Sequence, residues 1–242
     1  MNSLRFNFQK EKTKKINLFW GSVLGIFTIG ILGFFVAMFG FLHLLNNVIE
    51  ISTFTKRLLF IPAAIGIIII SITRRPPGQR TNIITSIFLF ILNIAIWSFF
   101  SALIVDIIVS SAINDFDSKS LLFSALIPLI IMGICAALSF LNVFTIARLS
   151  VLISVLFIAS IITFLVAFFV YRAYFWLLVI EVVLFSVVTI WNFKMFNTEL
   201  QNFNLDDNSE ILKKSIFYGL EFLISYFNLF IIMLRLISFT RD

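Results

Sequence analysis

Long apolar runs recur along the whole chain and are separated by short polar or charged segments. The last run, residues 216–237, reads IFYGLEFLISYFNLFIIMLRLI and is long enough to cross a bilayer as a helix. Of the 242 residues, 61% are hydrophobic and only 12% are charged, and the mean hydropathy is +1.10. A soluble domain of this size does not have such a composition. The sequence therefore predicts an all-α, polytopic integral membrane protein whose environment is the lipid bilayer.

The apolar runs predict a bundle of seven transmembrane helices. Their expected ranges are residues 16–44, 58–72, 82–105, 121–143, 149–170, 173–191 and 216–237. Residues 1–15 are expected to form a basic cytoplasmic arm, and residues 16–242 a single transmembrane helical domain. Asp106 is assigned to the loop after the third helix, and the polar stretch from Asn192 to Lys214 to the connection before the last helix. Gly21 and Gly25 lie four residues apart, which favours close packing of the first helix against a neighbour.

The basic residues predict the orientation of the chain. Twelve of the 18 Lys and Arg residues fall in the N-terminal arm and in the second, fourth and sixth connections. Because cytoplasmic loops carry an excess of Lys and Arg, the N-terminus is expected in the cytoplasm of a multi-pass protein of the cell membrane. With seven crossings, the C-terminus lies outside. The net charge of +6 is spread over short loops and does not form a surface that would bind nucleic acid.

Residue patterns of known catalytic and metal sites are missing from the sequence. There is no nucleophile elbow, phosphate-binding loop or metalloprotease helix. The single histidine, His43, has no neighbours that would complete a metal site, and the single cysteine, Cys135, lies in an apolar run. The sequence thus predicts a protein that is not an enzyme and that needs no metal or cofactor.

Polar side chains inside the last apolar run indicate that this helix lies in the centre of the bundle. Glu221, Ser225, Asn228 and Arg235 all fall within it. An ionised side chain that faces lipid costs at least ~2.5 kcal/mol, so these groups are expected to face other helices.

The same run resembles the final helix of the Bax inhibitor-1-like membrane proteins. That family usually reads Asp-Phe-Ile-Asn-Leu-Phe, then three residues, then Leu-Arg. This chain has Ser225-Tyr226-Phe227-Asn228-Leu229-Phe230 and, after three residues, Leu234-Arg235. Trp191-Asn192 is similar to the family's aromatic residue and aspartate at the end of the sixth helix, and the arginine-rich turn around Arg75 also fits the family.

The resemblance implies a protein that conducts ions or controls ion levels, with calcium or another cation as the ion. In calcium-leak members, the aspartate of the sixth helix pairs with that of the seventh, and the two carboxylates share a proton. This chain has Asn192 and Ser225 at those positions, so such a two-aspartate sensor is absent. The candidate polar path or gate comprises Arg75, Glu181, Asn192, Glu221, Ser225 and Asn228, with Glu221 as the expected carboxylate partner of Arg75.

Two other functions fit the sequence. A non-conducting scaffold that regulates a membrane protease or another membrane partner would use the same polar groups to hold its helices together. A small-solute transporter subunit is expected to show internal repeats or broken helices in matching positions, and neither is clear here.

Overall fold

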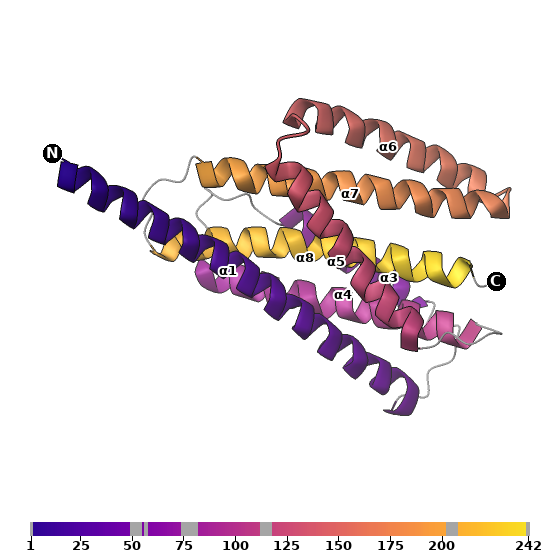
Figure 1. The fold of residues 1–242 in the computed structure, drawn as a ribbon. Coiled ribbons are helices and arrows are strands. Elements are labelled where there is room, and N and C mark those ends of the chain that lie inside the picture. The colour runs from indigo at the N-terminus through magenta and orange to yellow at the C-terminus, as the bar shows by residue number, and fades with distance from the viewer. Residues whose placement is uncertain are drawn as a thin grey trace. The chain divides into compact units, whose positions relative to one another are not determined.

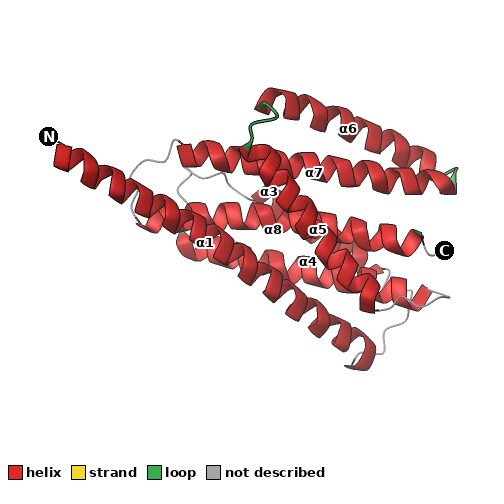
Figure 2. Ribbon diagram, viewed as in Figure 1, coloured by secondary structure: helices red, strands yellow, loops and turns green. Residues whose placement is uncertain are grey.

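The described part of the chain is helical throughout, apart from short turns. The computed structural model describes residues 2–48, 55, 58–73, 82–111, 118–201 and 208–240, and it contains no strand among them (Figures 1 and 2). The α-helices are α1 (Asn2–His43), α3 (Phe60–Thr73), α4 (Ile83–Ser111), α5 (Ser118–Phe140), α6 (Ile146–Ala167), α7 (Tyr171–Gln201) and α8 (Asn208–Phe239), and a π-helix, η1 (Leu44–Val48), follows α1. These seven α-helices confirm the predicted all-α class.

Six of the described helices are long and apolar enough to cross a membrane, namely α1, α4, α5, α6, α7 and α8. The helix α3 has 14 residues and spans ~21 Å, which is less than the ~30 Å thickness of the hydrocarbon core. α8 is by far the most buried of the six. In its most apolar 18-residue stretch 61% of the residues are buried, against 11% to 39% in the corresponding stretches of the others. This burial agrees with the prediction that the last helix is central.

Two compact units, interleaved in sequence, make up the chain. The first comprises residues 1–103 and 199–223, and the second comprises residues 104–198 and 224–242. The chain therefore passes from one unit to the other within α4, near the end of α7, and within α8.

In the first unit, α1 and α4 run in the same direction. A methyl group at Gly30 would lie 3.3 Å from Cζ of Phe90, and further along both helices the rings of Phe41 and Phe99 lie 5.3 Å apart. The hydroxyl of Ser98 donates a hydrogen bond of 3.0 Å to the backbone oxygen of Phe34 between these two points. Because α1 and α4 are parallel, the chain between them must return, and α3 is the helix that makes this return.

The direction of α3 follows from its contacts with α4. The rings of Phe60 and Phe100 lie 5.4 Å apart, while a methyl group at Gly66 would lie 3.3 Å from Cδ1 of Ile96. Moving forward along α3 thus means moving backward along α4, so the two helices are antiparallel. Although α3 is short, it reverses the chain as a second crossing would.

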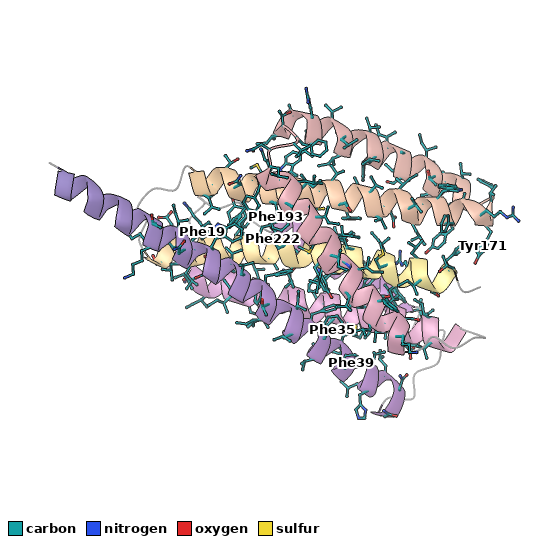
Figure 3. All side chains as sticks on the ribbon, viewed as in Figure 1. Phe19, Phe35, Phe39, Tyr171, Phe193 and Phe222 are labelled. Carbon is teal, nitrogen blue, oxygen red and sulfur yellow. The ribbon has the colours of Figure 1, made fainter. Side chains whose placement is uncertain are left out.

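α8 packs against α1 in the first unit, and these two helices are parallel. The rings of Phe19 and Tyr218 lie 6.1 Å apart. Phe19, which is labelled in Figure 3, is fully buried. Further along both helices, a methyl group at Gly30 would lie 2.6 Å from Cδ2 of Leu223. Contacts that run forward along α1 therefore also run forward along α8.

The prediction of close packing at Gly21 and Gly25 was wrong. Among the residues that the structure describes, nothing lies within 4 Å of a methyl group placed at either position. Close approach occurs instead at Gly30 and at Gly219, where a methyl group would lie 2.7 Å from Cγ2 of Ile26. Four-residue spacing of small residues does not identify which face of a long helix meets its neighbour.

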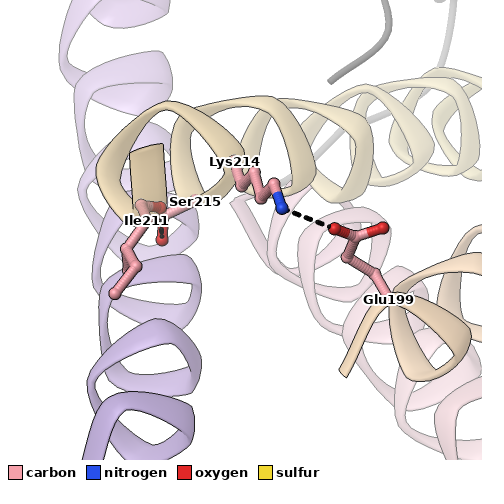
Figure 4. Close-up of polar contacts among 4 residues, drawn as sticks. All are labelled: Glu199, Ile211, Lys214 and Ser215. Carbon is pink, nitrogen blue, oxygen red and sulfur yellow. Dashed lines mark hydrogen bonds and ion pairs between the residues drawn. The ribbon is translucent and has the colours of Figure 1, made fainter. Parts of the chain in front are cut away.

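Both helices that flank the last connection are longer than predicted. The sequence assigns Asn192–Lys214 to a connection, but α7 continues to Gln201 and α8 begins at Asn208. One face of this polar-looking segment is apolar, because three buried residues recur on it at helical spacing, namely Phe193, Phe196 and Leu200. The two extensions are joined in the first unit, where Lys214 Nζ lies 2.9 Å from Glu199 Oε1 (Figure 4).

Two further boundaries also differ from the prediction. Asp106 lies inside α4, which ends at Ser111, and its side chain is buried. The apolar residues Ile107, Ile108 and Val109 extend the helix beyond this single carboxylate. At the other end of the chain, the basic segment 1–15 is not a separate arm in its backbone: from Asn2 onward it forms the first part of α1, which has 42 residues.

Candidate functional site

The candidate site lies between α7 and α8 in the second unit. At one end of this contact, the amide of Asn192 donates a hydrogen bond of 3.1 Å to the hydroxyl of Ser225. At the other end, the ring of Phe239 lies 5.1 Å from Tyr171 and 5.8 Å from Tyr174. Contacts that run forward along α8 run backward along α7, so the two helices are antiparallel. We call this contact, from Asn192–Ser225 to Phe239, the α7–α8 seam.

Helix geometry places several polar residues on one face of α7. Tyr174 precedes Glu181 by seven residues, about two turns, and Asn192 follows Tyr174 by 18 residues, about five turns, so all three share a face. Tyr174 and Asn192 both contact α8, so Glu181 between them also lies on the side of the seam. The rise from Tyr171 to Asn192 is ~31 Å, and Glu181 lies near the middle of this length of α7.

Arg235 of α8 lies at the same level of the seam as Glu181. From the Asn192–Ser225 hydrogen bond, Glu181 is eleven residues back along α7 and Arg235 is ten residues forward along α8, which corresponds to ~16 Å and ~15 Å. Arg235 also precedes Phe239 by one turn, so it lies near the α7-facing side of α8. Its charge attracts the carboxylate of Glu181, and both side chains are half-buried.

The structure brings Asn192 and Ser225 together, which are the two positions where the resemblance implies an aspartate pair. Ser225 is buried, with 3% of its surface exposed, and Asn192 is half-buried. An amide and a hydroxyl satisfy each other here without either group carrying a charge. The contact can hold two helices together, and its amide and hydroxyl oxygens are of the kind that bind hard cations.

Asn228, another residue of the candidate polar path, makes a hydrogen bond within its own helix. Its amide donates a hydrogen bond of 2.9 Å to the backbone oxygen of Ile224, one turn earlier on the same helix. A side chain bound to its own backbone is satisfied locally and needs no partner on another helix. Asn228 precedes Phe239 by eleven residues, about three turns, so it lies on the same face of α8 as Phe239 and within the α7–α8 seam, with its amide held by α8 itself.

The remaining predicted residues lie elsewhere. Glu221 belongs to the first unit, where it is half-buried and close enough to Tyr218 to act on it electrostatically, as do Glu199 and Lys214. Arg75 lies outside the described residues. The predicted pairing of Arg75 with Glu221 thus stays a prediction.

Two interhelical interactions of α8 were missed by sequence reasoning, one within the seam and one with α5. Arg235 was assigned to a family motif and not to Glu181, because the register of two helices is not visible in either helix alone. Tyr226 is fully buried, and its hydroxyl donates a hydrogen bond of 3.2 Å to the backbone oxygen of Ala125 in α5. A tyrosine next to the motif serine in an otherwise apolar run was the available signal, since a buried hydroxyl needs a partner.

Among the described residues, no group of three or more His, Cys, Asp or Glu side chains is placed to hold a metal ion.

The comparisons with known proteins add no family: the chain matches no protein-family model, and a search of curated proteins finds no significant match. The resemblance to Bax inhibitor-1-like proteins remains a prediction that depends on the residues of the last two helices.

Proposed function

We propose that this protein is a Bax inhibitor-1-like integral membrane protein that lets cations cross the bilayer, as a leak that contributes to ion homeostasis. The observation that carries the proposal is the α7–α8 seam, which combines Glu181, Asn192, Ser225 and Arg235 on two apolar helices. Charged residues are costly within a membrane and mark ion or proton pathways in membrane proteins. A carboxylate, an amide oxygen and a hydroxyl are also the kinds of ligand that hard cations such as Ca²⁺ prefer.

Purified protein in liposomes provides the direct test. Liposomes loaded with a calcium indicator, and a parallel set with a potassium indicator, are expected to show faster cation entry than empty liposomes. Glu181→Gln should slow entry, because it removes the carboxylate of the seam. Ser154→Ala is the matched control, since Ser154 bonds the backbone oxygen of Ser150 on its own helix α6 and lies outside the seam. Entry no faster than in empty liposomes, with the protein correctly inserted, would contradict the proposal.

A second candidate function is a non-conducting scaffold that binds another membrane protein. The observation in its favour is that two neutral amides of α7 and α8 already have hydrogen-bond partners. The amide of Asn192 donates to the hydroxyl of Ser225, and the amide of Asn228 donates to a backbone oxygen of its own helix. Such groups are known to stabilise helix packing in membranes without conducting anything. A scaffold would show no cation entry in liposomes, and it would be recovered from native membranes cross-linked to a partner such as a membrane protease.

A further inference from the structure

The register of α7 and α8 sets two opposite charges at one level of the seam. The Asn192–Ser225 hydrogen bond fixes one end of the seam, and the contacts of Phe239 with Tyr171 and Tyr174 fix the other. Glu181 and Arg235 lie between these two fixed points, one on each helix. Neither the family resemblance nor the proposed leak function assigns a role to this juxtaposition.

We propose that Arg235 acts as a built-in counter-charge that restrains cation passage by occupying the electrostatic position next to Glu181. The inference rests on the proposed leak function and names the group that regulates it. Arginine keeps its charge at every pH at which a protein is folded, so its restraint does not depend on protonation. A cation that enters the seam must replace the guanidinium as the partner of the Glu181 carboxylate.

The physical reason is the low dielectric of the site. Opposite charges attract each other, and the attraction grows as water is excluded from between them. With Arg235 present, the pair carries no net charge, and a cation gains little from approaching it. Without Arg235, the carboxylate of Glu181 is left without its counter-charge and attracts cations into the seam.

A purely structural pair predicts a different set of results. If Glu181 and Arg235 only hold α7 against α8, then removing either charge loosens the same contact, and both substitutions act on flux in the same direction. If Arg235 restrains cations that Glu181 attracts, the two substitutions act in opposite directions. The sign of the effect thus distinguishes the two roles.

Cation entry into liposomes is the first measurement. Arg235→Gln should raise the rate of entry about tenfold over the native protein, because the restraining charge is gone. Arg235→Lys keeps the charge and should stay close to native, while Glu181→Gln combined with Arg235→Gln should return entry to the native rate or below. Arg172→Gln is the matched control, since Arg172 is an exposed arginine at the start of α7 and away from this level of the seam.

Thermal unfolding in detergent is the second measurement, and it does not depend on flux. Glu181→Gln and Arg235→Gln should each lower the Tm. Exchanging the charges, with Glu181→Arg and Arg235→Glu in one protein, should recover most of the loss. A charge exchange that recovers nothing shows that the pair does not form and overturns the inference. Tm coupling together with unchanged or slower entry for Arg235→Gln also overturns it. If native protein and all variants match empty liposomes, the leak function itself fails; if native protein leaks but Arg235→Gln does not exceed it, only the restraint fails.

Discussion

The amide of Asn192 donates a hydrogen bond of 3.1 Å to the hydroxyl of Ser225, joining α7 to α8 across the second unit. The two residues are 33 positions apart in sequence, and each occupies the place where the resemblance implies an aspartate. A neutral amide and hydroxyl thus make the contact that two carboxylates would make only by sharing a proton. The seam is held at this point by a bond that does not depend on protonation.

Removing either partner of this bond should destabilise the helix pair. We expect Asn192→Ala and Ser225→Ala each to lower the free energy of unfolding by about 1 kcal/mol, and the two losses to be coupled in a double-mutant cycle. Unfolding in detergent, followed by circular dichroism, provides the measurement. Asn228→Ala is the control, because its amide bonds Ile224 on its own helix. Strictly additive losses from Asn192→Ala and Ser225→Ala would show that the bond contributes nothing.

The basic residues of the sequence predict an orientation that can be tested. With the N-terminus in the cytoplasm and seven crossings, Lys14 near the start of α1 is expected inside and Thr240 after the end of α8 outside, and both residues are exposed. In a Cys135→Ser background, Thr240→Cys in intact cells should react with an impermeant thiol reagent, and Lys14→Cys should react only after the membrane is opened. Labelling of Lys14→Cys from outside, with Thr240→Cys protected, would reverse the predicted orientation.

The response of the leak to pH is predicted by the chemistry of the Asn192–Ser225 pair. Amide and hydroxyl groups do not titrate between about pH 6 and 8, so cation entry through the native protein should change little over that range. The double substitution Asn192→Asp and Ser225→Asp creates a coupled carboxylate pair, and entry should then change steeply with pH. The single substitutions Asn192→Asp and Ser225→Asp are the controls, because a protein with only one of these carboxylates has no second carboxylate with which to share a proton. A steep response of the native protein that survives Glu181→Gln would contradict this account.

Close approach of α1 and α8 gives a prediction with an internal control. In Gly219→Ala the new methyl group would lie 2.7 Å from Cγ2 and 3.1 Å from Cβ of Ile26, a β-branched residue with little freedom to move in a helix. We expect a loss of about 1–3 kcal/mol of unfolding free energy, the usual cost of overpacking. Gly25→Ala meets nothing within 4 Å, and it should stabilise α1 by up to about 1 kcal/mol. Equal effects of the two substitutions, measured as Tm in detergent, would mean that α1 and α8 do not touch at Gly219.

Apolarity predicted well where the helices lie along the sequence, but it did not predict where all of them end. The apolar runs placed α5 and α6 within three residues of their observed ends, because those helices are apolar along almost all of their length. The end of α7 was missed because Phe193, Phe196 and Leu200 alternate with polar residues such as Asn197. An amphipathic segment of this kind has the average polarity of a loop, and only its periodicity identifies it as a helix.

Candidate site residues could be chosen from the chemistry of one helix, but the relation of Glu181 to Arg235 could not be predicted because it depends on two helices. Glu181 was identified from its own chemistry, since an acid inside an apolar run is a candidate without further information. Its relation to Arg235 required the register of α7 against α8, and that register is fixed by distant contacts such as those of Phe239. Asp106 shows the opposite error, because one carboxylate was interpreted as the end of a helix that continues to Ser111.

Tyr226 and Pro128 provide the last prediction, which concerns how α8 supports α5. Pro128 lies inside α5 and has no backbone N–H, so it cannot donate the helical hydrogen bond to the carbonyl four residues earlier. The turn that this weakens contains Ala125, whose backbone oxygen accepts the hydrogen bond of 3.2 Å from the Tyr226 hydroxyl. Tyr226 is fully buried and its ring stacks on Phe230 at 6.3 Å, so the hydroxyl is held in place by its own helix.

We expect Tyr226→Phe to lower the free energy of unfolding by about 1 kcal/mol, because the ring stays in place and only the hydrogen bond is lost. In a Pro128→Ala background, α5 has its full set of helical hydrogen bonds, and the cost of Tyr226→Phe should shrink. Tyr174→Phe is the control, since Tyr174 contacts Phe239 through its ring, which the substitution keeps. The measurement is a double-mutant cycle of Tm values in detergent. If Tyr226→Phe costs as much in the Pro128→Ala background as in the native protein, Tyr226 stabilises α8 alone and does not compensate for the proline in α5.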